Sequence, residues 1–172
     1  VSVMAVRAAE LALQQAGLLG DPVLRSGRAG IAFGSSSGSP PALAEFGSMI
    51  LAKSVATLTA TSYVRMMAHT AAVNLGMFYG MVGRIVTTTS ACTAGSQGIG
   101  YAYEAIRFGR QDVMIAGGAE ELDPTQSAVF DTLYATSTRN TEPDTTPRPY
   151  DAARDGLVIG EGAGALVLEA RD

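Results

Sequence analysis

The chain has 172 residues, of which 47% are apolar and 16% are charged, so it can bury a core and is not intrinsically disordered. Its net charge is −4 and Lys53 is its only lysine, which leaves no basic face for nucleic acid, and no apolar stretch reaches the roughly 20 residues of a membrane span. One cysteine and one histidine exclude an intramolecular disulfide and a cysteine-pair metal site, and the unpaired thiol is typical of a reducing compartment such as the cytoplasm.

The first half of the sequence predicts helices around one short buried strand. Apolar residues at helical spacing, which end at Gly17, indicate the first helix. A run of small residues follows the strand. In chain order we expect a helix at 2–16, a strand at 28–33, a loop at 34–38, a helix at 42–53, a polar connector at 57–62 and one helix at 63–81.

The second half predicts further alternation of strands and helices. We expect a strand at 85–89, a helix at 93–108, a strand at 113–116 stopped by Gly117 and Gly118, a helix at 125–134, a long loop at 136–150, and a hairpin or two strands at 157–169. Strands that alternate with helices indicate an α/β domain with a buried sheet.

Cys92 lies where a strand is predicted to end and a helix to begin. Unpaired backbone N–H groups and the helix dipole favour negative charge at such a position, which stabilises a thiolate. The same N–H groups can bind the oxyanion that forms when a thioester carbonyl is attacked. This arrangement is typical of a nucleophile on a strand–turn–helix elbow. The alternative is a small buried apolar residue, and the local pattern leaves both open.

Other candidate residues favour structural roles. His69 is interpreted as a packed or loop histidine. The glycine run at 160–164 leads into a predicted strand, whereas a dinucleotide-binding loop must open a helix. Glu120, Glu121 and Asp123 are interpreted as solvated or ion-paired carboxylates. We expect no metal site.

Four segments in order resemble β-ketoacyl-acyl carrier protein synthases. They are Ser90-Ala91-Cys92-Thr93-Ala94-Gly95, the stretch from Gly109 to Glu120 with its Gly-Gly pair, Ser137-Thr138-Arg139-Asn140, and Arg148-Pro149-Tyr150-Asp151 through Arg154-Asp155-Gly156 to Gly160-Glu161-Gly162-Ala163-Gly164. The wording of the last segment is similar to that of the elongating synthases and of the ketosynthase domains of polyketide synthases.

The resemblance implies a thiolase-like α/β fold, in which two similar halves form five layers. Residues 1 to about 145 would cover most of the N-terminal half, and about 146 to 172 the connection and first strands beyond it. Family members are more than twice as long. Their first strand and helix would precede Val1, and two catalytic histidines, a lysine and a glycine-rich loop would follow residue 172. We therefore expect that this polypeptide alone does not catalyse condensation.

The resemblance also implies an activity, that of an acyltransferase of the 3-oxoacyl-[acyl-carrier-protein] synthase type. Cys92 would accept an acyl group from acyl carrier protein, with its backbone N–H in the oxyanion hole. A decarboxylative Claisen condensation with malonyl-acyl carrier protein would follow, in fatty-acid or polyketide synthesis. Ala91 and Phe130 would line the acyl pocket. No cofactor is implied, and the expected partners are acyl carrier protein and a second copy, which would meet at the strand before Cys92.

Three alternatives remain. The first is a thiolase or an initiating synthase that uses coenzyme A thioesters, which the Arg154-Asp155-Gly156 wording disfavours. The second is an inactive partner subunit that shapes an acyl tunnel, which the presence of Cys92 disfavours. The third is a generic α/β small-molecule binder with a structural cysteine. The reactivity of the thiol distinguishes the third from the condensing enzymes.

Overall fold

The computed structural model describes residues 1–171, which form two units that are described separately. The larger unit, Val1–Glu121 with Gly162 onward, contains a four-stranded sheet in the order β2-β1-β3-β4. Strands β2, β1 and β3 run parallel, and β4 runs antiparallel to β3. The bounds of the strands are β1 Ala29–Gly34, β2 Ile85–Thr88, β3 Val113–Glu120 and β4 Gly162–Glu169.

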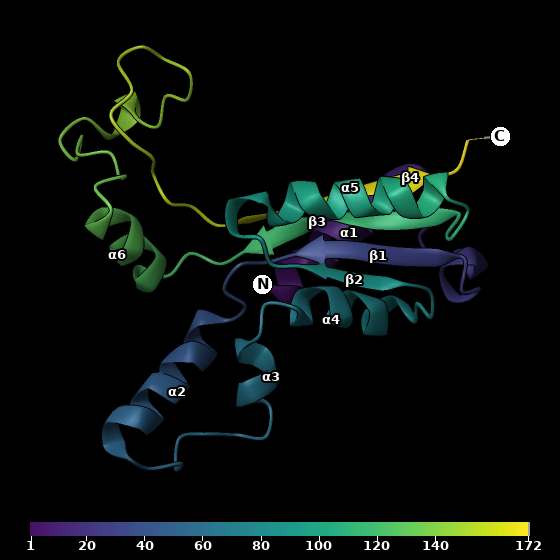
Figure 1. The fold of residues 1–172 in the computed structure, drawn as a ribbon, viewed down its shortest axis with the longest axis horizontal. Helices are drawn as coiled ribbons and strands as arrows, with labels where there is room; N and C mark the ends of the chain where they lie inside the picture. Colours follow the sequence, from purple (N-terminus) through teal and green to yellow (C-terminus); the bar gives the residue numbers. More distant parts are fainter. Residues whose placement is uncertain (172) are drawn as a thin grey trace. The chain divides into compact units, whose positions relative to one another are not determined.

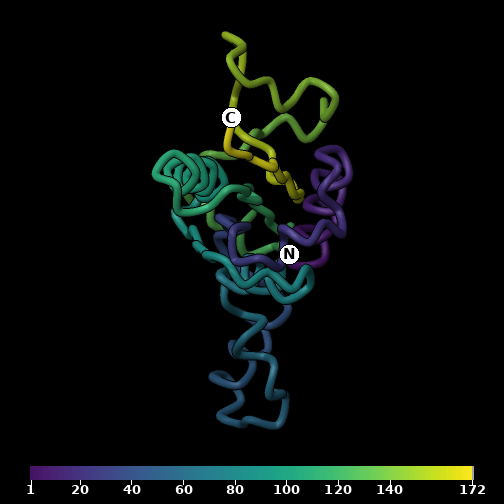
Figure 2. Tube along the Cα trace, turned by 90° about the vertical axis from the view of Figure 1, so that its right-hand side faces the viewer, coloured from purple at the N-terminus to yellow at the C-terminus, as the bar shows by residue number. Residues whose placement is uncertain are grey.

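Helices cover both faces of this sheet (Figure 1). Helices α1 (Ser2–Ala16) and α4 (Thr70–Tyr79) pack on one face, and α5 (Ala94–Arg107) packs on the other. Figure 2 shows α1 and α5 on opposite sides of the strands. The result is a three-layered α/β/α unit, as the alternation of strands and helices predicts.

The two faces of the sheet carry side chains of different size, because successive strand residues point to opposite faces. Ile31, Phe33 and Ile115 are almost fully buried beneath α1 and α4, and they form the larger core cluster. Ala32 and Ala116 point to the opposite face, beneath α5. Small side chains on that face allow α5 to lie close to the sheet.

Helices α2 (Pro40–Ala52) and α3 (Ser62–Met66) pack against each other. The rings of Phe46 and Tyr63 meet edge to face with their centroids 6.3 Å apart. The Glu45 carboxylate accepts hydrogen bonds from the Ser62 hydroxyl and, at 2.9 Å, from the Arg65 guanidinium. One aromatic contact and two hydrogen bonds to Glu45 therefore join this helix pair.

The single helix predicted at 63–81 is wrong, because the chain breaks between α3 and α4. Met67 is extended, with φ −85° and ψ 132°. The Arg65 carbonyl accepts a hydrogen bond from the Ser39 amide at 3.1 Å instead of continuing the helical ladder, and the Thr70 hydroxyl donates to the Met67 carbonyl at 2.7 Å. A contact with a distant segment thus overrides the local helical pattern.

Two strand predictions are also corrected. β3 does not stop at Gly117 and Gly118 but continues to Glu120, because both glycines pair with β1 and β4. The expected hairpin or pair of strands at 157–169 is one strand, Gly162–Glu169, and Leu157 makes only an isolated bridge with Thr136. Pairing partners, which sequence does not reveal, decide both cases.

The second unit, Leu122–Glu161, contains helix α6 (Pro124–Thr132) and a 3₁₀ turn at Pro143–Thr145. The Asp123 side chain caps α6 by accepting from the Thr125 amide at 2.8 Å. The predicted division of the chain at about residue 145 refers to the halves of the complete fold and stays a prediction. Among residues 1–171, no helix has the length and apolar character needed to cross a membrane.

Gly98 and Gly100 provide a matched test of the packing of α5. A Cβ atom at Gly98 would lie 2.7 Å from the Ala32 carbonyl oxygen, whereas one at Gly100 would meet nothing within 4 Å. We expect Gly98→Ala to lower the free energy of unfolding by about 1–3 kcal/mol through overpacking. Gly100→Ala should raise it by about 0.5–1 kcal/mol. Urea denaturation of both variants checks this, and equal effects would contradict the close approach of α5 to β1.

Candidate active site at the elbow between β2 and α5

Cys92 lies on a sharp turn between a strand and a helix. β2 ends at Thr88, residues Ala91–Thr93 form a 3₁₀ turn, and α5 begins at Ala94. Ala91 has φ 50°, in the left-handed region that costs an L-residue about 1–2 kcal/mol. The predicted strand–turn–helix junction is therefore confirmed, and its backbone is strained one residue before the cysteine.

Hydrogen bonds close this elbow at its base and at its centre. The Thr88 hydroxyl, which is buried, donates to the Ala94 carbonyl at 2.7 Å and thereby ties the end of β2 to the start of α5. Inside the turn, the Thr93 hydroxyl and amide both donate to the Ser90 carbonyl, at 2.8 and 3.2 Å. The segment that carries Cys92 is therefore closed by side-chain bonds at its base and at its centre.

The thiol of Cys92 is exposed, so it does not fill a core position in the described chain. Within residues 1–171 the Cys92 amide makes no hydrogen bond to a backbone or side-chain acceptor. An exposed thiol beside a free amide can attack a carbonyl and donate a hydrogen bond to the oxyanion that forms.

Of the other predicted residues, Ala91 is an exposed neighbour of Cys92, and Phe130 lies half-buried on α6 in the Leu122–Glu161 unit. Their roles in an acyl pocket stay predictions. His69 is exposed just before α4, where its carbonyl accepts a hydrogen bond from the Val73 amide at 3.3 Å. Nothing in the described chain brings its side chain into a hydrogen bond.

The three carboxylates at the end of β3 have separate partners, as their structural interpretation predicts. The Glu121 carboxylate lies against the backbone nitrogen of Val1, and Asp123 caps α6, where the hydroxyl and amide of Thr125 lower the pKa of its carboxyl group. Glu120 binds a serine loop, which the sequence did not indicate. Among residues 1–171, no three acidic, histidine or cysteine side chains converge as metal ligands would.

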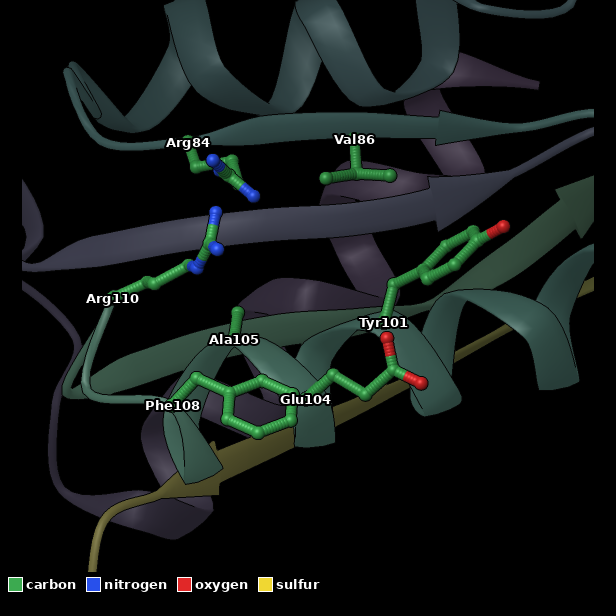
Figure 3. A pocket seen from close by; sticks show the side chains of 7 residues that line it. All are labelled: Arg84, Val86, Tyr101, Glu104, Ala105, Phe108 and Arg110. Atoms are coloured by element: carbon green, nitrogen blue, oxygen red, sulfur yellow. The ribbon is translucent and has the colours of Figure 1, made fainter.

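A hollow of about 390 Å³ lies between α5 and the edge strand β2 (Figure 3). Arg84 and Arg110 extend into it toward each other, and neither guanidinium has an ion-pair partner among residues 1–171. Its wall is mostly apolar, with Val86 on the strand side and Ala105 and Phe108 on the helix side. Tyr101 and Glu104, also on α5, complete the lining.

Comparison with known proteins decides the family. The sequence matches the family described as "Beta-ketoacyl synthase, N-terminal domain" over residues 1–172. The chain belongs to the β-ketoacyl synthase family. It is 36% identical over 167 residues to a mitochondrial 3-oxoacyl-[acyl-carrier-protein] synthase of Arabidopsis thaliana, a match that covers 96% of this chain and 36% of the relative.

Solved structures of β-ketoacyl synthases share this fold. A beta-ketoacyl synthase from Burkholderia phymatum superimposes with a TM-score of 0.95 at 60% identity, over 99% of this chain and 42% of that one. A type II polyketide synthase complex of a ketosynthase with its acyl-carrier protein and a bound hexaketide superimposes with a TM-score of 0.81 at 30% identity, over 98% and 43%. The thiolase-like fold is therefore confirmed, and the chain spans roughly two fifths of these relatives.

In this β-ketoacyl synthase chain, the Arg-Asp-Gly segment holds a loop of the second unit together. The Asp155 carboxylate accepts from the Ser137 hydroxyl at 2.9 Å and the Thr138 amide at 3.1 Å, and it pairs with Arg139 at 3.4 Å. Desolvation opposes the charge of Asp155, but these bonds and the Arg139 charge together lower its pKa. The ion-pair partner of Asp155 is therefore Arg139, from the same unit of the chain.

Asp155→Asn should therefore weaken the second unit in a pH-dependent way. The folded pKa lies below the ordinary aspartate value of 3.8, so the contribution of the carboxylate is complete above that value and is lost as pH falls through the folded pKa. We expect the variant to expose the Thr138 amide to hydrogen exchange at pH 7, and to differ less from the wild type at pH 2.5. Asp144→Asn is the control, since its carboxylate has no bonded partner within residues 1–171. An equal effect of Asp155→Asn at both pH values would contradict this.

Proposed function

We propose that this chain carries the acyl-accepting thiol of a β-ketoacyl-acyl carrier protein synthase. The exposed position of Cys92 on the strained elbow is the observation that carries the proposal. The chain spans 36% to 43% of the length of the relatives described above, so the activity is proposed for the full-length protein. The unpaired exposed thiol supports a reducing compartment, and we place the reaction in the cytoplasm.

The first half-reaction is transfer of an acyl group to Cys92. The thiolate attacks the carbonyl carbon of an acyl thioester on acyl carrier protein, and the Cys92 amide donates a hydrogen bond to the oxyanion. A carbon–sulfur bond to Cys92 forms as the bond to the carrier sulfur breaks. The carrier leaves as a thiolate and takes up a proton.

The second half-reaction is the condensation. A malonyl thioester on acyl carrier protein loses carbon dioxide, and the electron pair of the broken bond remains on the carbon beside the thioester. This carbanion attacks the carbonyl of acyl-Cys92, which forms the new carbon–carbon bond and releases the Cys92 thiolate. The product is a β-ketoacyl thioester on the carrier.

A second candidate is ketosynthase chemistry in polyketide synthesis. The relative bound to a type II acyl-carrier protein and a hexaketide, 30% identical to this chain, favours it. Both candidates use the same thiol and the same carrier, and they differ in the acyl chain that is accepted. The choice of acyl donor in the experiment below distinguishes them.

Cys92→Ala should abolish acylation of the full-length protein. Because Cys92 is the only cysteine of these 172 residues, a single added acyl group that maps to its peptide is decisive. We expect wild-type protein to gain one acyl group from an acyl-carrier-protein thioester, measured by intact mass, and the variant to gain none. Fatty acyl and β-ketoacyl donors should be compared as separate arms. A folded wild-type protein that leaves Cys92 unmodified by both donors would contradict the proposed function.

We further propose that two copies associate along β2, in agreement with the expected homodimer. β2 is at the edge of the sheet, with β1 on its one paired side. In a twofold interface the same surface of each copy faces that of the other, so Arg84 and Arg110 of one copy can meet Glu104 of its partner. The partly exposed Tyr101 and Phe108 beside them supply apolar area.

The charges of the hollow provide the test. Replacing both Arg84 and Arg110 by Glu should raise the dimer dissociation constant by roughly tenfold or more, because like charges would then face each other. Adding Glu104→Arg should restore association. Arg7→Glu, on α1 at the opposite face of the sheet, is the control and should have no effect. Sedimentation over a range of concentrations measures this. Association that is unchanged in the double variant would contradict the interface.

A further inference from the structure

The carboxylate of Glu120 binds the loop that follows β1. Glu120 is the last residue of β3, and its two oxygens accept three hydrogen bonds from consecutive serines. Its Oε1 accepts from the Ser35 hydroxyl and the Ser37 amide, both at 3.2 Å, and its Oε2 accepts from the Ser36 amide at 2.6 Å. Hydrogen bonds to a charged acceptor are stronger than neutral ones, so one side chain fixes the whole turn.

The same turn is bonded to the strand that leads to the cysteine. The buried Ser35 donates its amide to the Thr88 carbonyl at 3.3 Å, and its hydroxyl oxygen also accepts from the Gly38 amide at 3.3 Å. Thr88 in turn donates its hydroxyl to the Ala94 carbonyl. A continuous series of hydrogen bonds therefore runs from Glu120 through Ser35 and Thr88 to Ala94, on either side of the segment that carries Cys92.

Backbone contact joins the same elements a second time. A Cβ atom at Gly118, two residues before Glu120, would lie 3.3 Å from the Gly34 carbonyl oxygen and 3.3 Å from the Gly95 Cα atom. The end of β3, the end of β1 and the first turn of α5 thus touch without side chains between them. Close-packed contacts of this kind transmit displacements because no flexible atoms absorb them.

We propose that Glu120 is a positioning residue for Cys92. By holding the Ser35–Ser37 turn against the ends of β1 and β2, its carboxylate sets the position of the elbow relative to the start of α5. The thiol and the amide that donates to the oxyanion are then aligned for attack on a thioester. This inference rests on the proposed function, since alignment matters only if Cys92 attacks a carbonyl.

Two reactions of the same thiol separate alignment from simple reactivity. Acylation by a thioester passes through an oxyanion and needs the aligned amide, whereas alkylation by iodoacetamide is a direct displacement that forms no oxyanion. In the full-length protein at 25 °C we expect Glu120→Ala to slow acylation of Cys92 by about 100-fold, the usual cost of a misplaced reacting group. Alkylation should change far less. Glu120→Asp, which keeps the charge, should recover much of the acylation rate, and Glu120→Gln should recover less.

Glu121→Gln is the matched control, because the serine turn is bonded to the Glu120 carboxylate, whereas the neighbouring Glu121 carboxylate lies against the backbone nitrogen of Val1. It should leave both rates unchanged. Thermal unfolding of each variant shows that the folded state is being assayed. Acylation of Glu120→Ala at the wild-type rate, or an equal loss of acylation and alkylation, would overturn the inference and leave the proposed function intact. Wild-type protein that is alkylated but never acylated at Cys92 would overturn both.

Discussion

Helix α5 lies against the sheet with almost no side chain between the two backbones. Gly98 faces the Ala32 carbonyl so closely that a single methyl group would overlap it, and Gly95 meets Gly118 at the other end of the contact. Alanines fill the rest of this face, where Ala102 and Ala105 are buried. The position of the helix is consequently set by backbone contact, which has little freedom to shift. Because Cys92 immediately precedes this helix, the thiol takes its place from the same contact.

Strain and hydrogen bonding complete this placement. The left-handed conformation of Ala91 turns the chain sharply between β2 and α5, at a cost that the surrounding structure must offset. The bond from the Thr88 hydroxyl to the Ala94 carbonyl closes the base of the turn, and Thr93 closes its centre. An exposed residue can therefore have a defined position, which a nucleophile requires. The fold confines the cysteine without burying it.

The two ends of α5 present different chemistry. Its first turn follows the exposed thiol, whereas its last turn and the edge strand enclose the hollow that contains Arg84 and Arg110. A 14-residue helix separates them by about 20 Å. The proposed acyl transfer and the proposed association of two copies would thus use opposite ends of one helix. The edge strand β2 would take part in both, because it directly follows Arg84 and leads to Cys92.

Local sequence determined the elements on which the site depends. The β-branched run at 85–89, the small residues after Cys92 and the ordered family motifs were sufficient to predict the elbow, the helix and the family. These features are local, because strand propensity, helix capping and glycine placement act over a few residues.

Tertiary structure decided the rest. Gly117 and Gly118 lie inside a strand because β1 and β4 pair with them. The helix predicted at 63–81 breaks because the Arg65 carbonyl accepts a hydrogen bond from the Ser39 amide. The Glu120 carboxylate accepts hydrogen bonds from the serine turn only because the fold brings together segments 84 residues apart in sequence. A hydrogen bond between distant segments leaves no periodic signal in either one.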